Sequence, residues 1–262
     1  MMDTVRIETD ALGVATLWLA RPEKRNAMSG QMIAELADAA GKLAADDAVR
    51  VVVLAAEGPV FCAGGDLGWM QEQMAADAEK RRREAGALAM MLKALNELPK
   101  PLIGRVHGNA FGGGVGLISV CDAAVAAKTA SFGLTETRLG LIPATIGPYV
   151  VARLGEGMAR RVFMSGRVFG AEEAVRLGLL GRSVPDGDLD RAVADEVSPY
   201  LGCAPGAVAE AKALARRLGA NVGMAEIDAS IDALVKRWES EEAREGTSAF
   251  FEKRKARWVS GD

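Results

Sequence analysis

Side chains suited to metal binding and covalent catalysis are scarce in this sequence. Histidine occurs once, at His107, and the three cysteines, Cys62, Cys121 and Cys203, lie far apart. Three scattered cysteines are too few for a disulfide framework or a metal site, so we expect no bound metal and a reducing compartment. No serine or cysteine nucleophile with an acidic partner is arranged around His107, which favours a structural role for it. A small buried side chain is likewise the common use of a cysteine such as Cys62.

The sequence also lacks an excess of positive charge and any long apolar run. Its formal net charge is −3, so it has no general basic field to hold nucleic acid or an anionic membrane. The basic runs at 79–84 and 252–257 are typical of solvated helix faces. No apolar run is long enough to span a bilayer, and the first residues lack the apolar stretch of a signal peptide. We therefore expect a cytoplasmic protein with no nucleic-acid or membrane partner.

Alternating strands and helices predict an α/β fold. The alternating residues 5–9 and 14–20 predict an opening hairpin, and Ser29 is placed to cap the helix that follows it. The β-branched run 49–56 and the segment 99–108 predict strands buried on both faces. Helix-like patterns follow at 31–46 and in a long charged stretch that ends near Leu98. A short helix and a further short strand are expected over 115–127, and from about Arg160 onward the pattern is helical, in the segments 171–180, 189–201, 205–219 and 224–246.

Glycine, by contrast, is abundant, and two glycine-bearing loops each follow a buried strand. They are "FCAGGDL" at 61–67 and "FGGGVGL" at 111–117, and each leads toward a helix. Backbone N–H groups fixed on two adjacent loops could converge on one oxygen, which is the basis of an oxyanion hole. Close packing of a helix on a strand is the alternative explanation for the glycines. A dinucleotide or phosphate site is poorly supported, because neither G-x-G-x-x-G nor a Walker A motif is present.

One carboxylate, Glu136, is a candidate general acid or base. It lies in the segment "SFGLTETRLGLIPATIG" at 131–147, which has no other acidic residue. Apolar surroundings raise the pKa of a carboxyl group and suit it to proton transfer near neutral pH. The alternative is a glutamate at a helix start, paired with Arg138.

Taken together, six stretches in this order resemble the enoyl-CoA hydratase/isomerase, or crotonase, superfamily over nearly the whole chain. The resemblance implies a crotonase-like spiral of ββα units over 1–198 and a C-terminal helical trimerisation region over 199–262. It further implies a homotrimer or a dimer of trimers, an acyl-CoA substrate, a place in fatty-acid or lipid metabolism, and no cofactor beyond the coenzyme A of the substrate. The stretches are "LARPEKRNAMS", "VVLAAEGPVFCAGGDL", "VHGNAFGGGVGL…CDAAVAA", "ASFGLTETRLGLIP", "ARRVFMSGRVFGAEEAVRLGLL" and "AFFEKRKARW".

The resemblance also implies roles for individual residues. The oxyanion-hole donors are the N–H groups of Gly65 and Gly113, and Glu136 matches the second of the two glutamates of typical hydratases. Phe250 and Lys253 match positions that reach a coenzyme A held by the adjacent subunit. The other expected ligand contacts are Lys24, Arg25, Ala27, Ala63, Gly64, Asp66 and Leu67.

The first of the two family glutamates is missing, because its position is occupied by Gly116. A single glutamate suffices to shuttle a proton in an isomerase. The segments around Gly113 and Glu136 nevertheless look most like hydratases of methylglutaconyl-CoA or isohexenylglutaconyl-CoA, whose substrates carry a second carboxylate. Arg138 and Arg82 are candidates to meet that carboxylate, unless each forms a surface ion pair. We favour hydration of an α,β-unsaturated acyl-CoA over isomerisation of a 3-enoyl-CoA to a 2-enoyl-CoA; decarboxylation and non-catalytic acyl-CoA binding are further alternatives.

Overall fold

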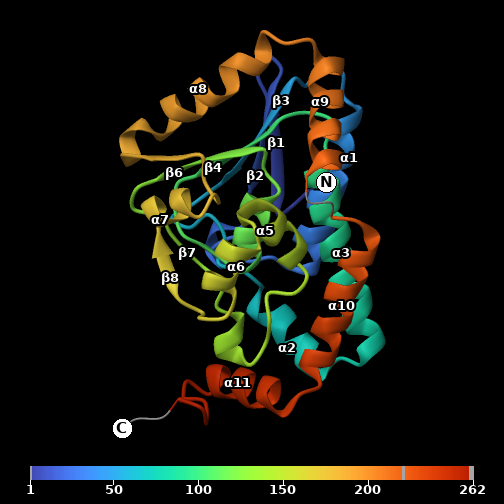
Figure 1. Ribbon diagram of the computed structural model, residues 1–262, viewed down its shortest axis with the longest axis vertical. Helices are drawn as coiled ribbons and strands as arrows, with labels where there is room; N and C mark the ends of the chain where they lie inside the picture. Colours follow the sequence, from blue (N-terminus) through green and yellow to red (C-terminus); the bar gives the residue numbers. More distant parts are fainter. Residues whose placement is uncertain (1, 220–221, 260–262) are drawn as a thin grey trace.

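The computed structural model describes residues 2–219 and 222–259, and a six-stranded sheet runs through its centre (Figure 1). The strand order is β1-β2-β3-β4-β6-β9. The β1–β2 hairpin is antiparallel, and every later neighbour in this sheet pairs in parallel. The strands are β1 (Val5–Thr9), β2 (Val14–Leu19), β3 (Val51–Ala56), β4 (Leu102–Val106), β6 (Ala123–Ala127) and β9 (Arg182–Val184).

A second sheet of three short strands has the order β5-β7-β8. Strand β5 (Ala110–Phe111) pairs in parallel with β7 (Ser131–Gly133), and β7 pairs antiparallel with β8 (Val168–Gly170). Strand β5 follows β4 after a few residues, so the chain passes from the large sheet to the small one just before the triple glycine. The small sheet therefore anchors both sides of the segment that carries these glycines.

Helices cover the large sheet on both faces because its central strands alternate between two apolar clusters. Val52 and Leu54 of β3 belong to the main core with α1 and α3, whereas Val51 and Val53 pack in a second cluster with α8. The helices are α1 (Gly30–Ala45), α2 (Leu67–Ala75), α3 (Ala78–Asn96), α4 (Gly113–Ser119), α5 (Gly147–Leu154), α6 (Glu156–Phe163), α7 (Ala171–Arg176), α8 (Leu189–Leu201), α9 (Pro205–Leu218), α10 (Met224–Trp238) and α11 (Glu241–Phe251). Three 3₁₀ segments join them: η1 (Pro22–Lys24), η2 (Glu136–Leu139) and η3 (Asp186–Asp188).

The predicted α/β organisation is confirmed in its first half. The hairpin is β1–β2, the run 51–56 is buried at every residue, and the Ser29 hydroxyl accepts the N–H of Met32 at the start of α1. The charged stretch before Leu98 is two helices, since Asp77 caps α3 by accepting the N–H of Lys80.

Two expectations for the second half were wrong. The region after Arg160 is not wholly helical, because it supplies β8 to the small sheet and β9 to the edge of the large one. These strands have only three residues each, too few to show a periodicity in the sequence. The helix expected over 224–246 is two helices, because the Ser240 hydroxyl caps α11 by accepting the N–H of Ala243.

The C-terminal helices pack on the same chain. Helix α10 contributes Ile227 and Ile231 to the main core and lies against α3, and α11 lies against η2 at the lower end of the molecule (Figure 1). The predicted boundary between 198 and 199 falls inside α8, and residues 220, 221 and 260–262 of the predicted C-terminal region lie outside the described residues. The domain division and the trimeric or hexameric assembly stay predictions. None of the helices in the described ranges combines the length and apolar character that a bilayer span needs.

Two glycines let α11 approach η2. A Cβ at Gly140, where φ is +69°, would collide with the backbone of Glu242, and one at Gly246 would collide with the carbonyl group of Leu139. Backbone atoms cannot step aside as the tip of a side chain can, so the contact requires glycine at both positions. Arg237 of α10 strengthens the junction by donating from Nε to the carbonyl of Gly140 at 2.6 Å.

A Gly246→Ala substitution should therefore destabilise the protein by about 1–3 kcal/mol, the usual cost of overpacking. Gly41→Ala is the matched control, because Gly41 lies exposed inside α1 with no atom near its added Cβ, and alanine there should stabilise by about 0.5–1 kcal/mol. Urea unfolding of both variants checks the prediction. Equal stability of the Gly246 variant and the wild type would contradict it.

Candidate active site

Pairing between the two glycine loops places them side by side. Strands β3 and β4 are parallel neighbours, so both loops leave the same edge of the large sheet. The N–H of Cys62 donates to the carbonyl of Asn109 at 3.2 Å, and the N–H of Phe111 donates to the carbonyl of Cys62 at 3.0 Å. Gly64 follows at φ +98°, and a Cβ at this position would lie 3.2 Å from the carbonyl oxygen of Phe111. The loops are thus joined as a short strand pair before each turns into its helix.

Two backbone N–H groups at this junction have no acceptor. Met28 donates to the carbonyl of Gly64 at 2.8 Å and accepts from Asp66 at 2.9 Å, and this bridge leaves the N–H of Gly65 between them unused. Gly112, at φ +49°, turns the chain into α4, whose first N–H, that of Gly113, has no intrahelical partner. Within the described part of the chain, neither Gly65 nor Gly113 donates its N–H to another group.

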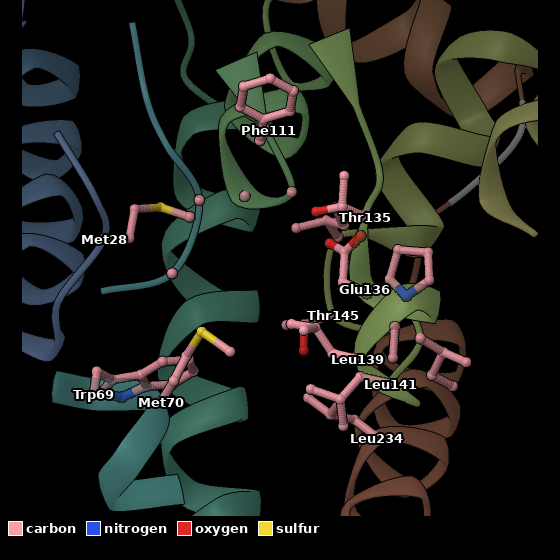
Figure 2. A pocket seen from close by; sticks show the side chains of 18 of the residues that line it. Met28, Trp69, Met70, Phe111, Thr135, Glu136, Leu139, Leu141, Thr145 and Leu234 are labelled. Carbon is pink, nitrogen blue, oxygen red and sulfur yellow. The ribbon is translucent and has the colours of Figure 1, made fainter. Parts of the chain in front are cut away.

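Both N–H groups belong to the lining of one cavity of about 580 Å³, within the range of small-molecule sites. Figure 2 shows its side chains: Met28, Trp69 and Met70 lie on one side, and Glu136, Thr145, Leu141 and Leu234 on the other. The walls are mostly apolar. Apart from the two tryptophans, the polar side chains of the lining are Thr135, Glu136, Arg138 and Thr145.

Glu136 is the one carboxylate that the described residues contribute to this lining, and it faces the glycine junction. It is the first residue of η2, and a Cβ built on Gly112 would lie 3.0 Å from its Oε1. Its Oε2 is buried and has no hydrogen-bond partner among the described residues. Burial raises the pKa of this carboxyl to about 7. A group with that pKa can both take and give a proton near neutral pH.

The alternative interpretation, in which Glu136 is paired with Arg138, is wrong. In the described structure no ion pair joins Glu136 to Arg138, although both line the cavity. The exposed Arg138 side chain instead packs over the α-carbon of Gly166. Arg82, the other cation considered for a substrate carboxylate, lies on α3 outside the cavity lining and pairs with Asp232 of α10, so the surface-ion-pair alternative is correct for it.

Ile146 fills the space beside Gly116. A Cβ at Gly116 would lie 2.6 Å from Cγ2 of Ile146, and Gly116 itself is buried. A glutamate cannot stand at this position unless Ile146 moves. An apolar side chain therefore occupies the space beside Gly116, and Glu136 is the single carboxylate that the described residues contribute to the cavity lining.

The predicted ligand contacts fall into two groups. Ala63, Gly64, Leu67 and Phe250 line the cavity together with Gly65, Gly113 and Glu136. Lys24, Arg25, Ala27, Asp66 and Lys253 lie outside the lining.

Residues of the second group form contacts outside the cavity lining. Arg25 follows η1 as its C-terminal capping residue, and its carbonyl accepts the N–H of Ala63. The Asp66 carboxylate caps α2 and pairs with Arg21 at 3.1 Å. Phe250, which the resemblance assigned to the neighbouring subunit's ligand, lines the cavity of its own chain.

Several site residues were not found from the sequence. Met28, Trp69, Met70, Thr145 and Ile146 line the cavity, yet in the sequence they are ordinary apolar or small residues. Contacts between loops decide the positions of these residues, and no sequence pattern predicts those contacts.

Asn26 shows such loop contacts more clearly. Its side chain is fully buried and its φ is +51°, so its amide must form hydrogen bonds with the neighbouring backbone. It accepts from the N–H of Arg21 and donates to the carbonyls of Glu57 and Val60.

The structural roles expected for Cys62 and His107 agree with the geometry. Burial raises the pKa of the Cys62 thiol to about 12, so it is not a nucleophile near neutral pH. His107 contacts the carbonyl of Gly58 through Nε2 at 2.7 Å and is not part of the cavity lining. In the ranges 2–219 and 222–259, no three His, Cys, Asp or Glu side chains gather so that they could hold a metal ion.

Comparison with known proteins gives consistent matches over the whole chain. A family model described as enoyl-CoA hydratase/isomerase matches residues 9–261. The chain is 34% identical over 258 residues to the crotonyl-CoA hydratase of Syntrophomonas wolfei, which covers 94% of this chain and 95% of that protein. It is 32% identical over 254 residues to the enoyl-CoA isomerase/hydratase fer4 of Mycosarcoma maydis, which covers 93% and 91%.

A crystal structure of an enoyl-CoA hydratase from Mycobacterium avium matches with a TM-score of 0.85 at 33% identity, covering 99% of this chain and 100% of that one. These matches confirm the predicted fold class, a crotonase-like α/β fold with a helical C-terminal region.

The raised pKa of Glu136 makes stability depend on pH. The native state keeps a proton that the unfolded chain releases at its ordinary pKa of 4.5, so the free energy of unfolding falls as the pH rises from there through about 7. A Glu136→Gln substitution removes this ionisation. The stability of the variant relative to the wild type should therefore increase by about 2 kcal/mol between pH 5 and pH 8.

Urea unfolding at the two pH values measures this change, and Glu35→Gln is the matched control. Burial alone would raise the pKa of Glu35, but hydrogen bonds from Thr4 and Gln31 hold it at about 2, so Glu35 is ionised in both states above pH 5. The relative stability of the control should stay constant over this interval. A constant value for the Glu136 variant as well would show that the carboxyl is not buried as described.

Proposed function

Because the chain belongs to the enoyl-CoA hydratase/isomerase family, we propose that it hydrates an α,β-unsaturated acyl-CoA, with Glu136 as the proton-transfer group. The observation that carries this proposal is the position of a buried carboxyl that faces two backbone N–H groups in one apolar cavity, where neither Glu136 Oε2 nor these N–H groups have a hydrogen-bond partner among the described residues. The hydratases of Syntrophomonas wolfei and Mycobacterium avium support the same reaction class.

In the proposed mechanism the thioester oxygen accepts the N–H groups of Gly65 and Gly113. The water oxygen forms a bond to the β-carbon, and the π-electron pair moves through the α-carbon onto the thioester oxygen, where the two donors stabilise the enolate. Glu136 accepts a proton from the water. The enolate then collapses as the α-carbon takes a proton from the protonated Glu136. One O–H bond breaks, one C–O and one C–H bond form, and the glutamate is regenerated.

The shape and polarity of the cavity suit the proposed mechanism. The apolar walls around Trp69, Met70 and Leu141 hold the acyl chain, and the exclusion of bulk water strengthens the interactions of the enolate with its two donors. The coenzyme A portion is proposed to leave the cavity past the segments that carry Lys24, Arg25 and Lys253, where the cations meet its phosphates. The thioester provides the acidified α-carbon, and the mechanism uses no further cofactor.

Arg138 supports an acyl group that carries a second carboxylate, as in methylglutaconyl-type substrates. Among the described residues it is the one cationic side chain of the cavity lining, and no ion pair with another of them occupies its guanidinium. A guanidinium at the rim of an apolar cavity is suited to a bidentate contact with a carboxylate.

A second candidate function is isomerisation of a 3-enoyl-CoA to a 2-enoyl-CoA. The filling of the Gly116 position by Ile146 favours it, because proton shuttling needs one carboxylate and no water. The fer4 protein, whose name includes both activities, is consistent with either reaction.

The first test is ¹⁸O incorporation from labelled water into crotonyl-CoA and into 3-methylglutaconyl-CoA, read by mass spectrometry. Glu136→Gln should lower kcat by about 10²–10⁴-fold, the typical contribution of a general acid–base group, while the affinity for butyryl-CoA stays within about threefold. Label-free products from both enones, with Glu136-dependent conversion of a 3-enoyl-CoA, would instead establish the isomerase.

Arg138→Gln should raise KM for the carboxylated enoyl-CoA by about two- to fivefold and leave crotonyl-CoA kinetics unchanged, since an ion pair at an exposed group is worth up to about 1 kcal/mol. Arg82→Gln is the matched control, because this exposed arginine is paired with Asp232 outside the cavity lining and should change neither substrate's kinetics. A loss that is equal for both substrates would count against a carboxylate contact at Arg138.

A further inference from the structure

A second polar group of the cavity has no place in the mechanism above. The side chain of Thr145 lines the cavity, the residue is only 4% exposed, and its Oγ1 has no hydrogen-bond partner among the described residues. Leaving a buried hydroxyl unpaired costs about 1–3 kcal/mol, so such groups usually meet a ligand or a bound water. The cavity is the place from which that partner can come.

The loop that carries Thr145 is fixed to Glu136. The N–H of Leu141 donates to the carbonyl of Glu136 at 3.0 Å, and two tight turns follow, with Ala144 donating to Ile142 and Gly147 to Ala144, each at 2.8 Å. In Figure 2, Glu136 and Thr145 lie on the same side of the cavity, across from Trp69 and Met70. Movement of this loop is thereby restrained relative to the carboxyl.

The same loop compensates for the missing carboxylate in two consecutive residues. Ile146 fills the space beside Gly116, and Thr145, next to it in the chain, lines the cavity and carries a buried hydroxyl with no hydrogen-bond partner among the described residues. A neutral hydroxyl can accept two hydrogen bonds and donate one, and it places no second negative charge near Glu136. It can therefore orient a water without opposing the ionisation of the base.

We propose that Thr145 Oγ1 holds the water that adds to the β-carbon, as a water-positioning residue beside Glu136. This assignment rests on the proposed hydration. One proton of the water is directed to the Glu136 carboxylate and the other to Thr145 Oγ1, so that an oxygen lone pair is left for the β-carbon. Only the proton given to Glu136 is transferred, and the threonine keeps its own proton throughout.

The test separates water addition from proton transfer at carbon. Thr145→Val removes the hydroxyl and keeps the shape of the side chain, and Thr145→Ser restores the hydroxyl. Two rates are measured for each protein: ¹⁸O-water addition to crotonyl-CoA, and exchange of the α-protons of butyryl-CoA in deuterated water. The exchange needs Glu136 and the two N–H donors but adds no water.

Thr145→Val should lower kcat for hydration about 100-fold, the typical effect of misplacing a reacting group, with KM and the exchange rate within about threefold of the wild type. Thr145→Ser should recover most of kcat. The valine variant should also resist urea at least as well as the wild type, because its lost hydroxyl had no protein partner.

Each other outcome has a distinct meaning. Unchanged hydration in Thr145→Val overturns the Thr145 assignment and leaves the proposed function intact. Equal losses of hydration and exchange show a general structural role and overturn it too. A KM effect confined to carboxylated substrates shows that the hydroxyl binds the acyl group instead of water. Exchange without any hydration by the wild type overturns both the assignment and the proposed hydratase.

Discussion

The parallel pairing of β3 with β4 is the constraint on which the site depends. It sends the two glycine loops out of the same sheet edge, and the bonds between Cys62, Asn109 and Phe111 then join them as a short strand pair. Only after this pairing do the N–H groups of Gly65 and Gly113 lie in one cavity wall with no acceptor of their own. Side chains at Gly64 or Gly112 would strain the backbone, since both have positive φ. Glycine is abundant here because the backbone conformation requires it, more than because of any side-chain contact.

The second constraint is the burial of a carboxyl group whose Oε2 has no hydrogen-bond partner among the described residues. A carboxylate in apolar surroundings is unfavourable, and the fold tolerates Glu136 because it becomes protonated near neutral pH. The surrounding structure has to hold Glu136 in this buried position. Segment η2 carries it, and α11 presses on η2 through the close approach of Gly140 and Gly246. The C-terminal helices therefore take part in the site of their own chain, and Phe250 completes its lining.

The glycine at position 116 is consistent with its neighbours. Ile146 occupies the space that a side chain there would need. Among the described residues, the polar groups of the cavity lining are mainly Glu136, the backbone N–H donors and a few hydroxyl or cationic side chains. In the proposed mechanism these groups serve proton transfer and water addition at a carbon activated by a thioester, and Arg138 and the apolar wall are proposed to set the acyl preference.

The sequence by itself determined the α/β class, the hairpin, the buried strands, the Ser29 cap and, through six ordered stretches, the family and the positions of Gly65, Gly113 and Glu136. These follow from periodicity and from short local motifs, which a chain shows without being folded. Tertiary structure alone decided the rest. Strands β8 and β9 exist because they meet sheet edges that distant residues supply. Likewise, because segments far apart in the sequence pack together, Ile146 lies against Gly116, Phe250 lines its own chain's cavity, and the buried Thr145 hydroxyl has no hydrogen-bond partner among the described residues. No local pattern encodes such contacts, because each depends on the volume and direction of a partner tens of residues away.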